Sequence, residues 1–293
     1  MDCPILVWML FTNREMTPDE YAKCHAVLRE CAPHAPVRNA PSEPETMRQM
    51  VAFLLPLLMM RHRRVPRTRW RDQMTMVGKH WIEQARNIQH GPDDNPVAAA
   101  QRQRSMIGYH TSYDHNLVGM AMTQGRREDV VNIGIGIKEI SAPPGMSGND
   151  FAISLYHKLT PLEQTFIAPE QGEEIVMRRL CLILALKQAY IKAIGQPMGF
   201  DWSRLEFNIP EKKATGDGRP LAGWEFRVWT SELGWPIPNS DGHIKQAYQC
   251  AVAFFRRTRE TKFIWQNDAR ELESWVQFIT LDQLLNVADK LVE

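Results

Sequence analysis

Paired cysteines, a long apolar run and an excess of one charge are all missing from this chain of 293 residues. Its five cysteines show no C-x-x-C spacing and are odd in number, which argues against a disulfide framework or a zinc site. We therefore expect reduced thiols in a cytoplasmic protein. A net charge of +1 does not indicate a polyanionic partner, and we expect no nucleic-acid binding.

The apolar segments are too short to cross a membrane, and no membrane association is expected. The longest run, Met50–Met60, spans 11 residues and contains Pro56, whereas a membrane-spanning helix needs about 20. This run predicts a buried, kinked helix. The chain opens without a charged and then apolar leader, so no signal peptide is expected. A hydrophobic content of 44% is enough to bury a large core, as one domain or as two lobes.

The most regular pattern lies in Leu184–Gly195, with the sequence LALKQAYIKAIG. Apolar residues recur there at helical spacings of four, three and four, at Leu182, Leu186, Ala189 and Ala193. Gly195 suits the position just after the end of a helix. Upstream, Val130–Ile140 (VVNIGIGIKEI) is a β-branched apolar run that predicts a buried strand.

Other segments predict further elements. Thr17 opens a helix, and Ser42 with Glu45 forms a capping box for a helix through Met60. Pro92–Gln103 predicts a loop running into a short helix, and the tail from Leu272 to Val292 has helical periodicity. Strands are predicted at Ile5–Phe11, Leu117–Met122, Phe200–Asn208, Trp224–Trp229 and His243–Phe255.

Three segments, in this order, resemble one family signature: Gly134–Lys138 (GIGIK), Leu159–Glu163 (LTPLE) and Leu184–Gly195. The chain resembles the 4'-phosphopantetheinyl transferases of the surfactin-synthetase-activating type, including fungal members. Their patterns are a strand GIDxE, a segment F(S/T)xxE and a helix WxxKEAyxKxxG. The resemblance implies an α/β (α+β) fold of two similar lobes packed pseudo-symmetrically, 1–125 and 126–293, in a monomer.

The departures from the family pattern fall on its metal ligands. In the family, a carrier-protein serine attacks the pyrophosphate of coenzyme A, and Mg²⁺ is held by the acidic residues of GIDxE and KEA. The matching positions here are Gly136, Lys138 and Gln188. Three carboxylates are thus replaced by a hydrogen, an ammonium and an amide, a set that repels a divalent cation. Glu139 is no substitute because neighbouring side chains point to opposite faces of a strand. We assign no metal ligand and expect no required cofactor.

Four positions that the family uses to bind coenzyme A are retained. Gly78 and Lys79 match a Gly-Lys pair of the family, and Ser112 matches the serine of FNxSH. Lys187 matches the lysine of KEA. The resemblance implies that these four residues contact coenzyme A.

Four other residues are the candidates for catalysis: Tyr113, Lys138, Gln188 and Lys192. Tyr113 stands where the family has a histidine that touches coenzyme A, and Lys192 matches a lysine that approaches the pyrophosphate. Lys138, Lys187 and Lys192 would place three ammonium groups in one cleft, and repulsion with burial would lower a lysine pKa enough for a general base. The alternative is that all three are solvated and idle.

The segment Arg61–Arg71 (RHRRVPRTRWR) contains six arginines. Guanidinium groups bind phosphate oxygens in pairs, so the segment predicts a clamp for the 3'-phosphate of coenzyme A. A solvated surface loop is the alternative.

Three functions remain open. The first is a repurposed, metal-independent enzyme that performs a cyclisation, isomerisation or pericyclic step on a small molecule in natural-product biosynthesis. The second is a divergent 4'-phosphopantetheinyl transferase that uses coenzyme A with Mg²⁺ on an acyl carrier protein. The third is a non-catalytic module that binds coenzyme A or a carrier protein. The intact scaffold with altered metal positions favours the first.

Overall fold

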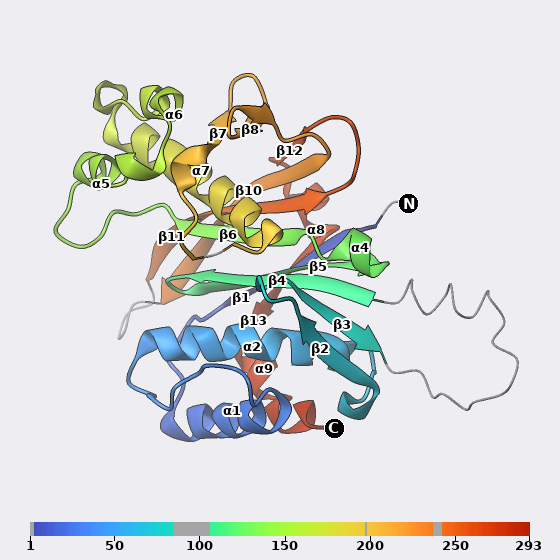
Figure 1. Ribbon diagram of the computed structural model, residues 1–293. Coiled ribbons are helices and arrows are strands. Elements are labelled where there is room, and N and C mark those ends of the chain that lie inside the picture. The colour runs from blue at the N-terminus through green and yellow to red at the C-terminus, as the bar shows by residue number, and fades with distance from the viewer. Residues whose placement is uncertain (1–2, 85–105, 197, 237–241) are drawn as a thin grey trace, which may run out of the picture. The chain divides into compact units, whose positions relative to one another are not determined.

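A computed structural model describes residues 3–84, 106–196, 198–236 and 242–293 (Figure 1). The predicted mixed α/β class is confirmed. The contacts divide the chain into unit 1, made of Met1–Val131, Trp235–His243 and Ser274–Glu293, and unit 2, made of Asn132–Gly234 and Ile244–Glu273. The tail from Ser274 onward thus packs in unit 1. The pseudo-symmetric lobes 1–125 and 126–293 stay a prediction.

Unit 1 is built on a sheet with the strand order β13-β1-β5-β4-β3-β2. β1 is parallel to β13, and the other neighbouring pairs are antiparallel. The strands are β1 (Ile5–Phe11), β2 (Trp70–Met74), β3 (His80–Gln84), β4 (Met106–Asp114), β5 (Leu117–Gly125) and β13 (Val276–Thr280). The predictions for β1 and β5 are confirmed, and the hairpin of β2 and β3 was not predicted.

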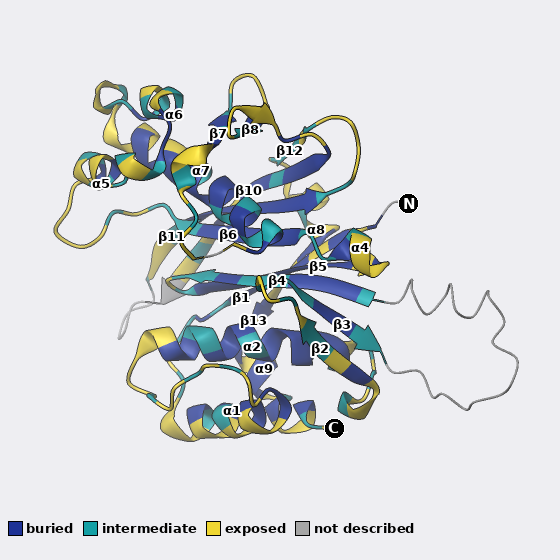
Figure 2. Cartoon of the chain, in the orientation of Figure 1, coloured by how far each residue is buried: buried dark blue, intermediate teal, exposed yellow. Residues whose placement is uncertain are grey.

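Helix α2 (Pro44–His62) packs on one face of this sheet, and helix α1 (Pro18–Cys31) packs against α2. Figure 2 shows α2 almost wholly buried and α1 exposed along one side. Thr17 precedes α1, as the sequence predicts, and it caps the helix with a capping box that was not predicted. The box predicted at Ser42 is wrong, because Glu43 is the residue before α2 and makes no side-chain cap bond. Proline at position 44 suits the start of a helix, since its missing N–H has no helical partner there.

The tail differs from the single helix that its periodicity predicted. It forms α8 (Ala269–Glu273), strand β13, α9 (Leu281–Leu285) and the 3-10 turn η5 (Ala288–Leu291). Strand β13 is stabilised by pairing with β1, a partner that local periodicity does not reveal.

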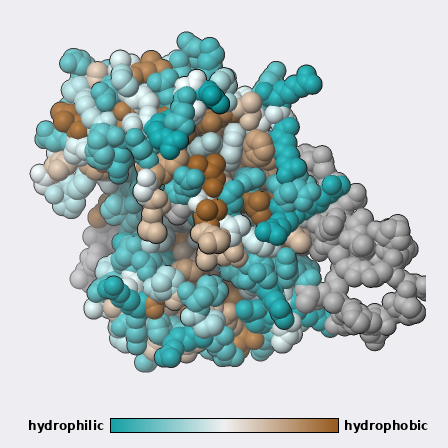
Figure 3. Space-filling view, viewed as in Figure 1, coloured by the Kyte–Doolittle hydropathy of each residue, from teal (hydrophilic) through white to brown (hydrophobic). Residues whose placement is uncertain are grey.

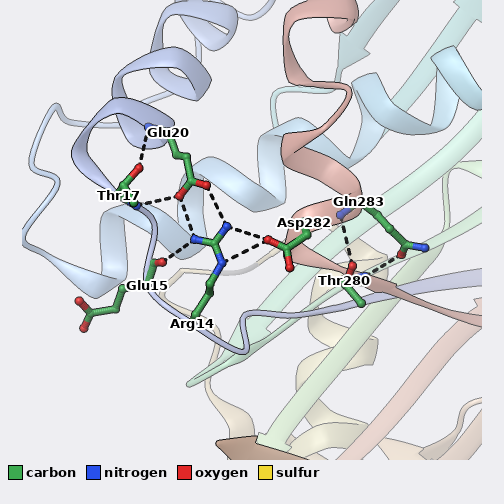
Figure 4. Close-up of polar contacts among 7 residues, drawn as sticks. All are labelled: Arg14, Glu15, Thr17, Glu20, Thr280, Asp282 and Gln283. Carbon is green, nitrogen blue, oxygen red and sulfur yellow. Dashed lines mark hydrogen bonds and ion pairs between the residues drawn. The ribbon is translucent and has the colours of Figure 1, made fainter. Parts of the chain in front are cut away.

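An arginine joins α9 to the start of α1 (Figure 4). Arg14 Nη2 lies 2.8 Å from Glu20 Oε1 and 2.7 Å from Asp282 Oδ1. The hydrogen bond from Arg14 lowers the pKa of Glu20 to about 2. These bonds hold the C-terminal segment against α1 within unit 1.

Unit 2 combines a sheet with one long helix, α7 (Glu173–Ile194). The sheet has the order β12-β10-β11-β6, and a smaller sheet has the order β7-β8-β9. The strands are β6 (Ile133–Glu139), β7 (Leu205–Asn208), β8 (Lys213–Gly216), β9 (Arg219–Pro220), β10 (Trp224–Pro236), β11 (His243–Phe255) and β12 (Lys262–Gln266). Aromatic rings from β7, β10 and β12 pack beside α7, among them Phe207, Phe226 and Phe263.

Short elements complete the described chain. They are α4 (Arg127–Val130), α5 (Gly148–Ser154), α6 (Pro161–Phe166) and the 3-10 turns η1 (Arg67–Arg69), η2 (Tyr156–Lys158), η3 (Pro169–Gln171) and η4 (Trp202–Arg204). The predictions of a buried strand near Ile133 and of a helix ending before Gly195, which adopts a left-handed conformation, are confirmed. The prediction for Pro92–Gln103 lies outside the described residues.

The surface in Figure 3 is mainly hydrophilic, with small apolar patches between polar side chains. No described helix is long and apolar enough to span a bilayer. All five cysteines are buried free thiols.

Candidate functional site

The site implied by the family pattern lies in unit 2, where strand β6 packs against helix α7. Gly134, Gly136 and Lys138 occupy one face of β6 because side chains alternate along a strand. Opposite them on β11, Ala253, Ala251 and Gln249 occupy the same register positions. The small residues let the backbone of α7 approach the strand closely.

Gly136 has no room for a side chain. A Cβ atom there would lie 2.9 Å from the carbonyl carbon and still closer to the carbonyl oxygen of Ala185, and 3.0 Å from the backbone nitrogen of Ala189. Gly134 is similarly enclosed, with a Cβ 3.1 Å from the Cα of Ala193. The helix backbone therefore fills the space into which a carboxylate at position 136 would project. The close packing of α7 on β6 therefore requires glycine at position 136, in addition to the fact that a metal ligand is missing there.

Gln188, at the third metal position, binds the protein backbone. Its Oε1 accepts a hydrogen bond of 3.0 Å from the N–H of Ile137. β6 is the last strand of its sheet, so this amide satisfies a backbone donor that no further strand of the described sheet reaches. Because Oε1 is occupied, the side-chain NH₂ is the part of Gln188 that suits a substrate.

Lys138, at the second metal position, acts electrostatically on Lys158 at the end of η2. Burial, and then repulsion by Lys138, lowers the pKa of Lys158. The Nζ atom of Lys158 lies 5.2 Å from the centre of the Trp202 ring. The sequence analysis missed Lys158, although it directly precedes the LTPLE segment that carries the resemblance.

Lys187 is fully buried and bound on all sides. Its Nζ lies 2.6 Å from Glu163 Oε2 and donates to the carbonyls of Lys158 at 2.8 Å and Trp202 at 2.9 Å. An ammonium has three donors, so this geometry leaves none for the coenzyme A contact that the resemblance implied. Burial lowers the pKa of Lys187, and the adjacent Glu163 opposes that shift.

Glu163 is equally committed to the fold. It is fully buried, its Oε2 accepts from the N–H of Thr160 at 2.9 Å, and its Oε1 accepts from the N–H of Phe207 at 2.8 Å. The Lys187–Glu163 pair thus joins α7, α6 and β7. The three lysines predicted to repel one another are therefore differently arranged: Lys138 acts on Lys158, and Lys187 is neutralised by its partner.

Lys192 lies one helical turn beyond Gln188 on α7 and is half-buried. Its predicted role as a proton carrier stays a prediction. Across residues 3–84, 106–196, 198–236 and 242–293, no three His, Cys, Asp or Glu side chains gather in a way that could hold a metal ion. Gly136, Lys138 and Gln188 supply no carboxylate, so the residues present do not fit the magnesium ion that the family uses.

The remaining predicted residues lie in unit 1. Gly78, with a φ of 79°, and Lys79 form the turn between β2 and β3. Ser112 is buried on β4, paired with Gly119 of β5. Their predicted contacts with coenzyme A stay predictions.

Tyr113, also on β4, binds the start of helix α2. Its hydroxyl donates a 2.8 Å hydrogen bond to Glu45 Oε1. Burial and this bond raise the pKa of Tyr113 to about 12. Tyr113 is thus a protonated donor at neutral pH, engaged with a carboxylate.

Three arginines of the arginine-rich segment form hydrogen bonds within the protein. Arg61 donates to the carbonyl of Lys290, Arg63 donates to Gln124, and Arg67 donates to the carbonyls of Cys31 and Trp70. Arg64, Arg69 and Arg71 are exposed. The segment combines structural arginines with solvated ones, and the clamp for the 3'-phosphate of coenzyme A stays a prediction.

Comparison with known proteins adds one relative. No protein-family model matches the chain. The chain is 25% identical over 226 residues to the protein named "4'-phosphopantetheinyl transferase pptA" of Paxillus involutus. The match covers 75% of this chain and 80% of that protein, so it extends well beyond the three motif segments.

Proposed function

Because the chain belongs to the 4'-phosphopantetheinyl transferase superfamily, we propose that it is a repurposed member that acts on a small molecule without the superfamily's magnesium centre. The reaction we propose is a proton transfer that isomerises or cyclises a carbonyl-containing intermediate of natural-product biosynthesis. A pericyclic step on a substrate held by the same residues is the related variant.

The enclosed Gly136 carries the proposal. A single replaced ligand is open to reversal by one substitution, but here the α7 backbone occupies the space that an acidic side chain would need. The other two positions are also committed, since Gln188 Oε1 binds the N–H of Ile137 and Lys138 is a cation. The packing at Gly136, the hydrogen bond of Gln188 and the positive charge of Lys138 therefore all support a reaction that uses no metal ion at this site.

Lys158 is the base in this proposal. Its lowered pKa increases the share of neutral amine at a given pH, and a neutral amine can take a proton from a carbon next to a carbonyl. Lys138 supplies positive charge that stabilises the negative charge developing on the carbonyl oxygen. The protonated Lys158 then returns the proton to another atom of the substrate, so atoms and charges balance without a cofactor.

The first experiment tests the absence of the ancestral activity. The purified protein is incubated with coenzyme A, Mg²⁺ and an apo acyl carrier protein, and the carrier is weighed by mass spectrometry. We expect no phosphopantetheine on the carrier serine. A carrier that is fully modified within minutes would contradict the proposal.

The second experiment identifies the reaction. The gene is deleted, the metabolite that accumulates is isolated, and the purified protein is tested on it in the presence of EDTA. We expect turnover that falls roughly 10²- to 10⁴-fold in Lys158→Met. The exposed Lys213→Met variant is the matched control and should leave the rate unchanged.

The pH dependence of the rate tests the interaction between Lys138 and Lys158 more sharply. Since Lys138 lowers the pKa of Lys158, a Lys138→Met variant should move the ascending limb of the kcat/KM profile, where Lys158 loses its proton, to higher pH. An unchanged transition would show that Lys158 is not the titrating base.

A divergent 4'-phosphopantetheinyl transferase is the second candidate. The name of the Paxillus involutus relative, a 4'-phosphopantetheinyl transferase, favours it. Lys138 would then replace part of the metal's charge next to the pyrophosphate, and an acyl carrier protein would be the partner. The carrier assay separates the two candidates directly.

A further inference from the structure

Unit 1 contains a group of polar side chains that the proposed function does not use. They line a cavity of about 80 Å³ between helix α2 and strands β2, β3 and β4. One side is apolar, with Phe53, Leu57 and Trp70. The other side carries Asp72 and His80.

Asp72 is a buried carboxylate with one oxygen unsatisfied. Its side chain is 17% exposed, and its Oδ2 accepts a 2.8 Å hydrogen bond from the hydroxyl of Tyr109. Its Oδ1 is buried and has no hydrogen-bond partner among the described residues. A buried acceptor without a donor costs free energy, so its presence in a native fold needs an explanation.

His80 lies beside this carboxylate and is also unsatisfied. Its Nδ1 is 3.9 Å from Asp72 Oδ2, too far for a hydrogen bond, and has no partner in the described part of the chain. Burial lowers the pKa of His80, so the ring is neutral at neutral pH, and the tautomer that carries its proton on Nε2 offers Nδ1 as an acceptor. The two orphan acceptors face one small space.

Helix α2 adds a third acceptor. Pro56 lies inside α2 and has no N–H, so the helical hydrogen bond to the carbonyl oxygen of Ala52 is missing. Both Ala52 and Pro56 line the cavity. The proline therefore leaves the carbonyl of Ala52 without its helical donor, at a residue that lines the cavity.

We propose that this cavity is a binding site for a small primary ammonium compound. An ammonium group has three donors, which match Asp72 Oδ1, His80 Nδ1 and the carbonyl of Ala52. Its charge is balanced by the carboxylate, and a short alkyl chain rests against Phe53, Leu57 and Trp70. The volume holds about five to eight water-sized groups, which suits a ligand of a few heavy atoms.

The charges favour a cation over an anion. An anion would meet the Asp72 carboxylate at short range. Arg67 also lines the cavity, but its guanidinium donates to the carbonyls of Cys31 and Trp70 and stacks 4.3 Å from the Trp70 ring. It is the weakest of the charged groups that act on the carboxylate. His34, which is 53% exposed at the side chain, marks an opening to solvent.

The test uses n-propylammonium and its neutral counterpart, 1-propanol, on the full-length protein. Four heavy atoms limit the Kd to no tighter than about 0.04 mM, so binding is followed by NMR titration of the His80 ring. We expect saturable shifts with the amine and at least tenfold weaker binding of the alcohol. Equal binding of both, or no shift up to 50-fold above that limit, would show that the cavity holds water only.

Variants extend the test. Asp72→Asn keeps the shape and removes the charge, so it should weaken amine binding by about ten- to a hundredfold. Asp19→Asn, an exposed change in unit 1, is the matched control and should leave binding unchanged. Unchanged affinity in Asp72→Asn would overturn the proposal. The amine and alcohol comparison needs no variant, so it decides even if Asp72→Asn fails to fold.

The same ammonium chemistry occurs on a lysine side chain of another protein. Nα-acetyl-lysine methylamide distinguishes this source from a free amine. Because the cavity is small and partly enclosed, we expect it to bind more weakly than n-propylammonium. Tighter binding of the lysine derivative would contradict a site for free small amines.

Discussion

Substitution of Gly136 by alanine tests the contact on which the account of the metal site depends. The added Cβ would lie 2.9 Å from the carbonyl carbon of Ala185 and 3.0 Å from the nitrogen of Ala189. Carbon atoms in favourable contact lie about 3.5–4.0 Å apart. The carbonyl oxygen of Ala185 would be closer still, so relief requires β6 and α7 to separate by more than about 1 Å, and all of these obstacles are backbone atoms that cannot rotate away.

The expected cost follows from that displacement. Overpacking of a core costs about 1–3 kcal/mol, and rigid backbone on both sides places Gly136→Ala at about 3 kcal/mol. In urea unfolding followed by tryptophan fluorescence, the midpoint should fall by about 1 M or more.

The matched control is Gly216→Ala in strand β8 of the same unit. Its nearest obstacles are ends of the flexible side chains of Leu221, at 3.1 Å, and Leu205, at 3.6 Å. We expect a change below about 1 kcal/mol there. Equal midpoints for wild type and both variants would refute the close packing of α7 on β6, and with it the reason that position 136 cannot carry a metal ligand.

Three further predictions concern charge. Lys187→Met leaves the buried Glu163 carboxylate without its partner, so it should lower the free energy of unfolding in urea by about 3–5 kcal/mol. The control Lys213→Met changes an exposed lysine and should leave the unfolding midpoint unchanged. In the folded protein Glu20 has a pKa of about 2, below its ordinary 4.5. Its contribution to stability is therefore present above pH 4.5 and is lost as the pH falls toward 2. In acid-unfolding experiments, Glu20→Gln should lose less stability than wild type over that pH range. The double variant Lys138→Glu, Gln188→Glu should still lack carrier modification by mass spectrometry, because position 136 stays closed, and rapid modification would contradict this.

Local patterns in the sequence predicted the elements whose causes are local. The apolar run of β1, the helix start at Thr17 and the left-handed Gly195 depend on neighbours within a few residues. Strand β13 depends on pairing with β1 at the other end of the chain, so its short segment was assigned to a helix. The hairpin of β2 and β3 was missed for a different reason, because its strands are polar and show no clear alternation.

The candidate site could also be predicted from the sequence only in part. The residue types at positions 136, 138 and 188 were enough to predict that carboxylates are missing from the metal positions. What those positions do instead depends on three-dimensional packing: the enclosed Gly136 and the bond from Ile137 to Gln188 are not visible in the sequence. Lys187 looked like a ligand of coenzyme A because spacing does not reveal that Glu163 lies 2.6 Å away.

The most direct test of the central claim is a titration of the protein with Mn²⁺, followed by electron paramagnetic resonance, in the presence of coenzyme A. Mn²⁺ prefers the same oxygen ligands as Mg²⁺. The account predicts that the protein leaves the signal of free Mn²⁺ unchanged compared with coenzyme A alone. One stoichiometric, protein-bound Mn²⁺ that is lost in the Gly136→Ala variant and kept in Gly216→Ala would contradict it.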